Sequence, residues 1–261
     1  MKKVLLATSA LVAFAGAAAA DVSLAGYARV AVETDGTTTS MDHRFQLGAT
    51  GSVETDSGLA LSVYSRLRVD DSERSDGFNT PTVTMKFGSV TVQAGNTYSA
   101  LTARTNPFGL GTGLNGDYGL YTNTGGWYSS GGGAGMDRIR IDLAAGDFVV
   151  SVSGDVSGDE AIAFGVSGSV AGFNVGVGMN DADAYEVDIN KAFGALKVGL
   201  KASDTVNGAY FGYTQGALGL QAYAGDNDDW GLGMTYDLGG ATVGAEYNQS
   251  GAANLVVGFS F

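Results

Sequence analysis

The stretch ANLVVGFSF, residues 253–261, alternates between apolar side chains and side chains that are mostly small or polar. Successive side chains of a β-strand point to opposite faces, so every second residue of this stretch lies on one face. The apolar face carries Ala253, Leu255, Val257, Phe259 and Phe261. The stretch therefore predicts a strand that is apolar on one face, ends in an aromatic ring, and accepts water on the other face.

Fifteen earlier segments show the same period-two alternation and are bounded by Gly, Asp or Asn. Counted between their outermost apolar residues, these segments are 22–32, 45–49, 59–69, 83–87, 90–92, 139–143, 148–152, 162–166, 173–179, 185–189, 196–200, 209–213, 218–222, 230–236 and 241–247. An even number of such strands is typical of a transmembrane antiparallel β-barrel. We therefore predict an all-β fold, a sixteen-stranded barrel wide enough to hold a water-filled lumen.

The connections between these segments alternate in character. Short turns such as 171–172 and 216–217 contain glycine, whereas connections such as 180–184 and 226–229 are longer and acidic. A barrel in an outer membrane has short turns on one rim and polar loops on the other. A soluble β-sandwich would alternate as well, but it does not need the aromatic residues that stand near many of these strand ends.

Residues 1–20 have the three parts of a secretory signal peptide. Lys2 and Lys3 supply the positive start, residues 4–15 are apolar, and residues 18–20 are alanines that precede Asp21. The apolar part is shorter than the roughly 20 residues of a membrane-spanning helix. We expect a cut before Asp21, which leaves residues 21–261 as one exported barrel domain.

The composition limits the classes of partner. Without Lys2 and Lys3, the chain has 12 basic residues against 27 acidic ones, a net charge near −15. Phosphate binding needs a basic face, so nucleic acid is not expected as a partner. The chain contains no cysteine, which excludes disulfides and zinc sites built on thiolates.

The arginines of the predicted strands fall on the polar face. In phase with that face are Arg29, Arg44, Arg66, Arg68, Arg138 and Arg140. A charged side chain on the lipid face costs about 2–4 kcal/mol at the membrane midplane, so these guanidinium groups are expected in the lumen. They either line the pore or form salt bridges that stiffen the wall, as Arg140 would with Asp142, and one residue can do both.

A connection of about 40 residues, 96–136, separates the fifth and sixth predicted strands. Arg104 and Asp117 are its only charged residues, and its aromatic residues include Tyr118, Tyr121, Trp127 and Tyr128. A loop this long is usually either functional or disordered, and the aromatic residues favour packing against another part of the chain. Folded into the barrel, this segment would form a constriction opposite the arginines.

With its signal segment, sixteen amphipathic strands, long loop and terminal Phe261, the chain resembles the general diffusion porins of Gram-negative outer membranes. The resemblance is closest to the α-proteobacterial type, in segments 51–58 (GSVETDSG) and 137–142 (DRIRID). It implies a homotrimer, surrounded by outer-membrane lipid and lipopolysaccharide, through which ions and small hydrophilic solutes diffuse passively. It implies neither an organic cofactor nor an enzymatic reaction.

The same resemblance implies roles for single residues. By position, the basic side of a constriction would be formed by Arg29, Arg44, Arg66 and Arg68. Asp117, on the loop bent into the barrel, would form the acidic side. The family's loop usually carries several acidic residues, whereas this loop carries Asp117 alone, which implies a weaker transverse field and a stronger preference for anions.

Two rival functions depend on few residues. A barrel enzyme would need a nucleophile and a base, and the only histidine, His43, stands beside Asp42 with Ser40 close by. A barrel adhesin would have no need of inward arginines.

Two further possibilities concern ligands. A calcium site has weak candidates in Asp226, Asp228 and Asp229, although such acidic runs are more often solvated loops. A second acidic set consists of Asp181, Asp183, Glu186 and Asp188. A channel selective for a sugar or an anion would use the aromatic residues of loop 96–136 as a slide. The sequence does not separate this slide from residues that merely anchor the loop.

Overall fold

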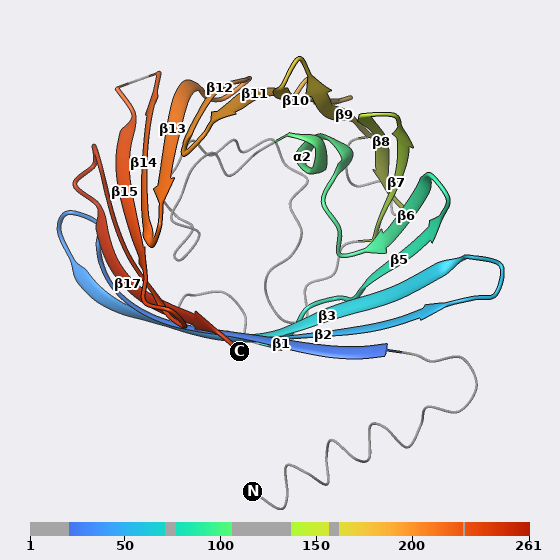
Figure 1. Ribbon diagram of the computed structural model, residues 1–261, viewed down its shortest axis with the longest axis horizontal. Coiled ribbons are helices and arrows are strands. Elements are labelled where there is room, and N and C mark those ends of the chain that lie inside the picture. The colour runs from blue at the N-terminus through green and yellow to red at the C-terminus, as the bar shows by residue number, and fades with distance from the viewer. Residues whose placement is uncertain (1–20, 71–76, 106–136, 157–161, 227) are drawn as a thin grey trace, which may run out of the picture.

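The computed structural model describes residues 21–70, 77–105, 137–156, 162–226 and 228–261. Its strands form one closed antiparallel sheet, the wall of a barrel (Figure 1). The first part of the wall consists of β1 (Asp21–Thr34), β2 (Thr39–Glu54), β3 (Ala60–Asp70), β4 (Gly77–Phe78), β5 (Thr82–Phe87), β6 (Val90–Gly95), β7 (Arg138–Ala145) and β8 (Phe148–Asp155). The second part consists of β9 (Ala163–Val170), β10 (Phe173–Asn180), β11 (Tyr185–Phe193), β12 (Leu196–Ser203), β13 (Asn207–Gln215), β14 (Leu218–Gly225), β15 (Trp230–Asp237), β16 (Thr242–Asn248) and β17 (Ala253–Ser260).

A short helix, α2 (Ala100–Arg104), follows β6. The side chain of Ser99 caps its beginning, because the Ser99 hydroxyl accepts the N–H of Thr102 at 3.2 Å. No helix in the described part of the chain is long and apolar enough to cross a membrane.

The ring closes between its first and last strands. β1 pairs with β2 on one side and with β17 on the other, and Val30 lies opposite Val257 in the closing pair. The backbones of Gly26 and Phe261 exchange two further hydrogen bonds, of 2.6 and 3.0 Å. Closure matters because lipid offers no hydrogen-bond partners to an open sheet edge.

The seventeen strand segments occupy sixteen positions in the wall, because β4 and β5 both pair with β3. An interruption at residues 79–81 separates these two segments. Pro81 has no N–H for a ladder, and the side-chain oxygen of Asn79 accepts the N–H of Arg66 at 2.8 Å. The prediction of sixteen strands is confirmed, with one broken strand that the alternation did not reveal.

The wall is apolar on its outer face. In β17, Leu255 and Val257 are 56% and 45% exposed, whereas Asn254 and Val256, which point inward, are 5% and 0% exposed. Large apolar side chains are exposed in the same phase along the other strands. A soluble β-sandwich would bury these side chains between its two sheets, so their exposure agrees with the barrel and not with the sandwich. An outward apolar belt is what a wall in lipid requires.

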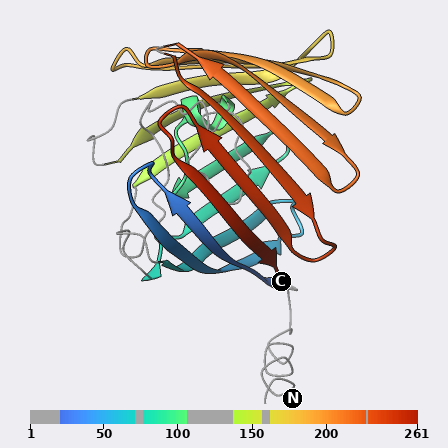
Figure 2. The same cartoon turned by 90° about the vertical axis from the view of Figure 1, so that its left-hand side faces the viewer.

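The two rims of the barrel are joined by tilted strands (Figure 2). At one rim, two-residue turns contain Gly146, Gly194 and Gly216, whose φ angles are +62°, +62° and +60°. Tight hairpin turns require positive φ, which glycine adopts without strain. The connection 181–184 belongs to the opposite rim, where β6 and β14 also end and β7 and β15 begin. The predicted difference between the rims is therefore present.

Candidate functional site

Four arginines point into the lumen from three adjacent strands. They are Arg29 on β1, Arg44 on β2, and Arg66 and Arg68 on β3. Their direction follows from the alternation, because the neighbouring Val30, Phe45 and Val69 are exposed on the outer face. We call these four residues the arginine cluster.

Two aspartates lie within the arginine cluster. Asp42 accepts hydrogen bonds from Arg29, at 2.9 Å from Nε and at 2.5 Å from Nη2. Asp70 forms a close ion pair with Arg68 and a longer one with Arg44, whose Nε lies 3.4 Å from Asp70 Oδ2. Three of the four guanidinium groups therefore contact these two carboxylates.

The members of the arginine cluster differ in exposure. Arg29, Arg66 and Arg68 are 4%, 7% and 4% exposed, whereas the side chain of Arg44 is 16% exposed. Arg44 is thus the most accessible guanidinium group of the four. The ion pairs show that the cluster also braces the wall, as the sequence allowed.

Arg138 and Arg140 on β7 hold the beginning of the long connection. Arg138 is 1% exposed and donates a hydrogen bond to the carbonyl oxygen of Thr97. Arg140 donates to the carbonyl oxygen of Tyr98 at 3.1 Å and to Oε1 of Gln93 at 2.6 Å. These contacts tie residues 97–98 to the wall, so both arginines have a positioning role in addition to the pore-lining role expected for them.

Asp142 and Ser153 extend this attachment to helix α2. Asp142 Oδ1 accepts a hydrogen bond from Arg140 Nε at 3.0 Å, which is the pair expected from the sequence. Arg104, at the end of the helix, reaches the same carboxylate, with its Nη2 3.9 Å from Oδ1. Ser153 Oγ accepts the N–H of Ala100 at 2.7 Å. Both ends of α2 are thereby fixed to β7 and β8.

Helix α2 lies inside the ring of strands, against β8, β9 and β10 (Figure 1). The wall beneath it has glycine at three inward positions, which we call the glycine seat: Gly165, Gly176 and Gly178. A Cβ atom would lie 2.2 Å from the carbonyl oxygen of Ala100 at Gly165, and 2.2 Å from that of Arg104 at Gly176. Any larger residue would push the helix toward the lumen, because Cβ atoms do not approach other atoms so closely.

The wall opposite the arginine cluster carries an acidic group on β11 (Figure 1). Glu186 and Asp188 both point inward and are 0% and 3% exposed. Nζ of Lys201 lies 3.3 Å from Glu186 Oε1, and the hydroxyl of Tyr210 donates to Asp188 Oδ2 at 2.9 Å. Sequence reasoning did not place these acids on the lumen wall, although they are in phase with its polar face.

For the acidic side of the constriction, the family resemblance implies Asp117 and neither of these two acids. Asp117 lies outside the described residues, as do Tyr118, Tyr121, Trp127 and Tyr128 of the same connection. The constriction and the aromatic slide therefore stay predictions.

His43 and Asp42 point to opposite faces of β2. His43 is exposed and stands opposite Val30 on the outer face, whereas Asp42 is 5% exposed and accepts hydrogen bonds from Arg29. A catalytic base needs a partner that orients it. Asp42 cannot orient His43 from the opposite face of the strand, so the pair of neighbouring residues that suggested a barrel enzyme does not form a catalytic pair.

Within the described ranges, no group of three or more His, Cys, Asp or Glu side chains has the arrangement of a metal site. Asp226 accepts a hydrogen bond from Asn207 Nδ2 at 3.0 Å, and Asp229 accepts one from the Tyr223 hydroxyl at 3.4 Å. Burial raises the pKa of the Asp229 carboxyl, and the charge of Asp226 raises it further. The backbone of Asp228 adopts the left-handed conformation, with a φ of +60°.

Comparison with known families gives one match over nearly the whole chain. The model of a family described as Gram-negative porin matches residues 7–257. A search among curated protein sequences found no match.

Solved structures match over the barrel. A double mutant of the Rh. blastica porin has a TM-score of 0.75 and 20% sequence identity, covering 92% of this chain and 100% of that one. A triple mutant of the Rhodopseudomonas blastica porin has a TM-score of 0.73 at 20% identity, with the same coverage. A third structure carries the description "Asymmetric conductivity of engineered proteins". It has a TM-score of 0.78 at 19% sequence identity, and the match covers 92% of this chain and 100% of that one. These likenesses support the same fold.

Proposed function

The chain belongs to the Gram-negative porin family, and we propose that its arginine cluster gives this passive channel of the bacterial outer membrane a preference for anions. The family and the closed barrel make it a channel for diffusion of small hydrophilic solutes and ions. The cluster is what distinguishes this channel from a neutral pore.

The observation that carries the proposal is the gathering of four inward-pointing guanidinium groups on the adjacent strands β1–β3. Asp42 pairs with Arg29, and Asp70 pairs with Arg44 and Arg68. Charges that line a narrow aqueous passage between walls of low dielectric constant act strongly on ions in it. Four guanidinium groups gathered on this sector would concentrate anions beside β1–β3.

The acids across the lumen would sharpen this field without reversing it. Glu186 and Asp188 face the cluster from β11, but Lys201 offsets part of their charge. An anion would therefore pass nearer the arginine side and a cation nearer the acidic side. We also propose that loop 96–136 narrows the passage, with Arg104 and Asp117 as its charged residues.

The subunit assembly is a separate proposal. The resemblance to general diffusion porins implies a homotrimer, and the outward apolar face of each barrel would supply the subunit contacts. The channel would need no cofactor and would catalyse no reaction, because solute gradients alone drive diffusion.

Proteoliposome swelling tests the preference for anions. Vesicles that contain the purified mature protein are exposed to an anionic and a cationic solute of similar size, and the two swelling rates are compared. We expect the wild type to admit the anion faster. Arg66→Ala should lower the anion-to-cation ratio about fourfold, because one charge roughly 10 Å from the solute in water changes the energies of the anion and of the cation by about 0.4 kcal/mol each, in opposite directions. Arg66→Lys, which keeps the charge, should retain the ratio, and equal ratios for all three proteins would contradict the proposal.

A further inference from the structure

Lys191 is an exception on the outer face of the barrel. It follows Ile189 on β11, in phase with the outward side chains of that strand. Among the described strand residues, it is the only Lys, Arg, Asp or Glu at an outward position. A lysine in contact with lipid is tolerated near the membrane surface, where its ammonium group can leave the hydrocarbon.

The ammonium group of Lys191 lies at the rim of the short turns. Its Nζ is 3.4 Å from the carbonyl oxygen of Ala171, in the turn between β9 and β10. The rings of Phe173 and Phe193 flank it, with centroids 4.3 and 5.5 Å away. None of the ion pairs between described residues includes Lys191. The cation is thus held in place by two aromatic rings and one carbonyl oxygen, and it has no acidic partner among the described residues.

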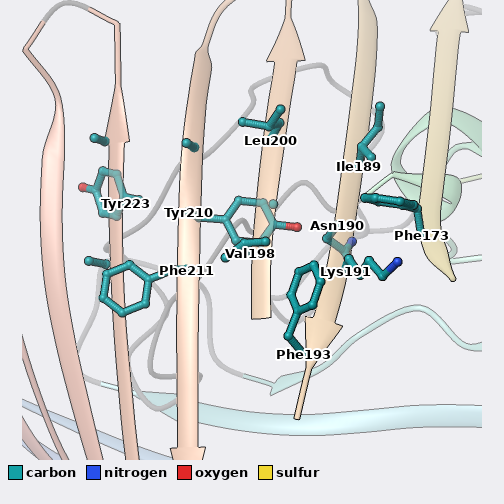
Figure 3. A pocket seen from close by; sticks show the side chains of 14 residues that line it. Phe173, Ile189, Asn190, Lys191, Phe193, Val198, Leu200, Tyr210, Phe211 and Tyr223 are labelled. Atoms are coloured by element: carbon teal, nitrogen blue, oxygen red, sulfur yellow. The ribbon is translucent and has the colours of Figure 1, made fainter. Parts of the chain in front are cut away.

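An apolar groove of about 500 Å³ begins beside Lys191 and runs over the outer face of β11–β14 (Figure 3). The wall is hollow there because three outward positions carry alanine: Ala209, Ala222 and Ala224. Leu200 lies beside Ala209 and Phe211 beside Ala222, so larger side chains border the hollow. A single methyl group cannot fill the space that leucine or phenylalanine fills on neighbouring strands.

We propose that Lys191 and this groove bind one anionic phospholipid, with the phosphate at the Lys191 ammonium and an acyl chain in the groove. The lipid would come from the leaflet on the side of the short turns, which is the periplasmic side of an outer-membrane barrel. A basic residue near the membrane surface attracts anionic lipid, and the groove supplies apolar contact for the chain. The proposal rests on the outer-membrane location that the family gives.

Charge complementarity favours a lipid over a second copy of the chain. The outward positions of the described strands carry no acidic residue, so the wall of another barrel would bury Lys191 without a carboxylate. Burying an unpaired charge is costly, whereas a lipid phosphate pairs with it.

The test is native mass spectrometry of the full mature protein, released from detergent after incubation with equal amounts of phosphatidylglycerol and phosphatidylcholine. We expect the wild type to retain phosphatidylglycerol preferentially. Lys191→Gln should lower the retained phosphatidylglycerol about fivefold, as expected for the loss of one basic residue at the membrane surface. Lys197→Gln, which removes an inward lysine on β12, is the matched control and should retain it.

A second variant tests the groove while keeping the charge. Ala222→Leu should fill the hollow and lower lipid retention, with Lys191 unchanged. Retention by Lys191→Gln equal to that of the wild type would overturn the proposal. Loss of the oligomer in either variant, measured by light scattering, would also overturn it and assign the groove to a subunit contact. Channel conductance of the same samples separates the two proposals, since a protein that forms no channels fails the proposed function whatever lipid it retains.

Discussion

Arg29 and Arg44 stand directly opposite each other in the β1–β2 pair, and both point into the lumen. Like charges at opposite positions of antiparallel strands destabilise the pair. Asp42 offsets this repulsion at Arg29, and Asp70 offsets it at Arg44. Each of these two like charges is thus paired with a carboxylate, so the loss of either aspartate is expected to change both the stability of the wall and the charge of the lumen.

Asp42→Ala should destabilise the barrel and strengthen the preference for anions. The Arg29–Asp42 side chains are 2% and 7% exposed, and removing one partner of a buried ion pair costs about 3–5 kcal/mol. The temperature at which the folded barrel loses its electrophoretic mobility measures the stability. Asp56→Ala, in an exposed turn, is the control and should leave that temperature unchanged. Equal temperatures for both variants would contradict the assigned role of Asp42.

Gly176→Ala should displace α2 toward the lumen and lower the single-channel conductance. The new Cβ would lie 2.2 Å from the carbonyl oxygen of Arg104, and overpacking of this kind costs about 1–3 kcal/mol. Gly51→Ala is the matched control, because its Cβ would meet Val63 at an ordinary 3.5 Å. If Gly176→Ala conducts as the wild type does, the glycine seat does not set the position of the helix.

Arg138→Met should loosen residues 97–98 and increase the noise of the open-channel current. The variant removes the hydrogen bond from the guanidinium group to the Thr97 carbonyl while keeping an unbranched side chain. Lys86→Met, at an exposed position on β5, removes one positive charge without this bond. Noise that rises equally in both variants would show that charge, and not attachment of the loop, is responsible.

Asp229 should make the barrel less stable as the pH rises through the pKa of its carboxyl. Burial raises that pKa above the ordinary value of 3.8, so the folded state holds the proton more tightly than the unfolded state. The stabilisation is complete below about pH 3.8 and is lost as the pH rises through the raised pKa. Asp229→Asn should therefore show a smaller fall in thermal stability between pH 4 and neutral pH than the wild type. An identical fall would refute this assignment.

The strands were predictable because one physical rule, apolar outside and polar inside, repeats along the whole wall. The same rule gave the direction of Arg29, Arg66 and Arg140. It also contained the exception at Lys191, whose phase matches Ile189, and the inward acids Glu186 and Asp188. These residues could have been found by extending the alternation of β11 to its charged positions.

Other features could not be predicted from periodicity. The break at residues 79–81 depends on the side chain of Asn79 replacing a ladder partner, which no alternation encodes. The glycine seat is visible only when α2 is placed against β9 and β10, since Gly165 and Gly176 otherwise resemble ordinary strand glycines. The roles of Arg138 and Arg140 likewise depend on the carbonyl groups of a segment distant in sequence.

The most direct test of the central claim is the reversal potential of the purified mature protein in a planar bilayer under a KCl gradient. The wild type should form open channels whose reversal potential has the sign of a channel that prefers anions. Arg44→Ala and Arg66→Ala should shift it toward the cation side, whereas Arg66→Lys should not. Channels whose reversal potential is the same in all four proteins would contradict the role of the arginine cluster, and the absence of channels from folded protein would contradict the account of an open pore.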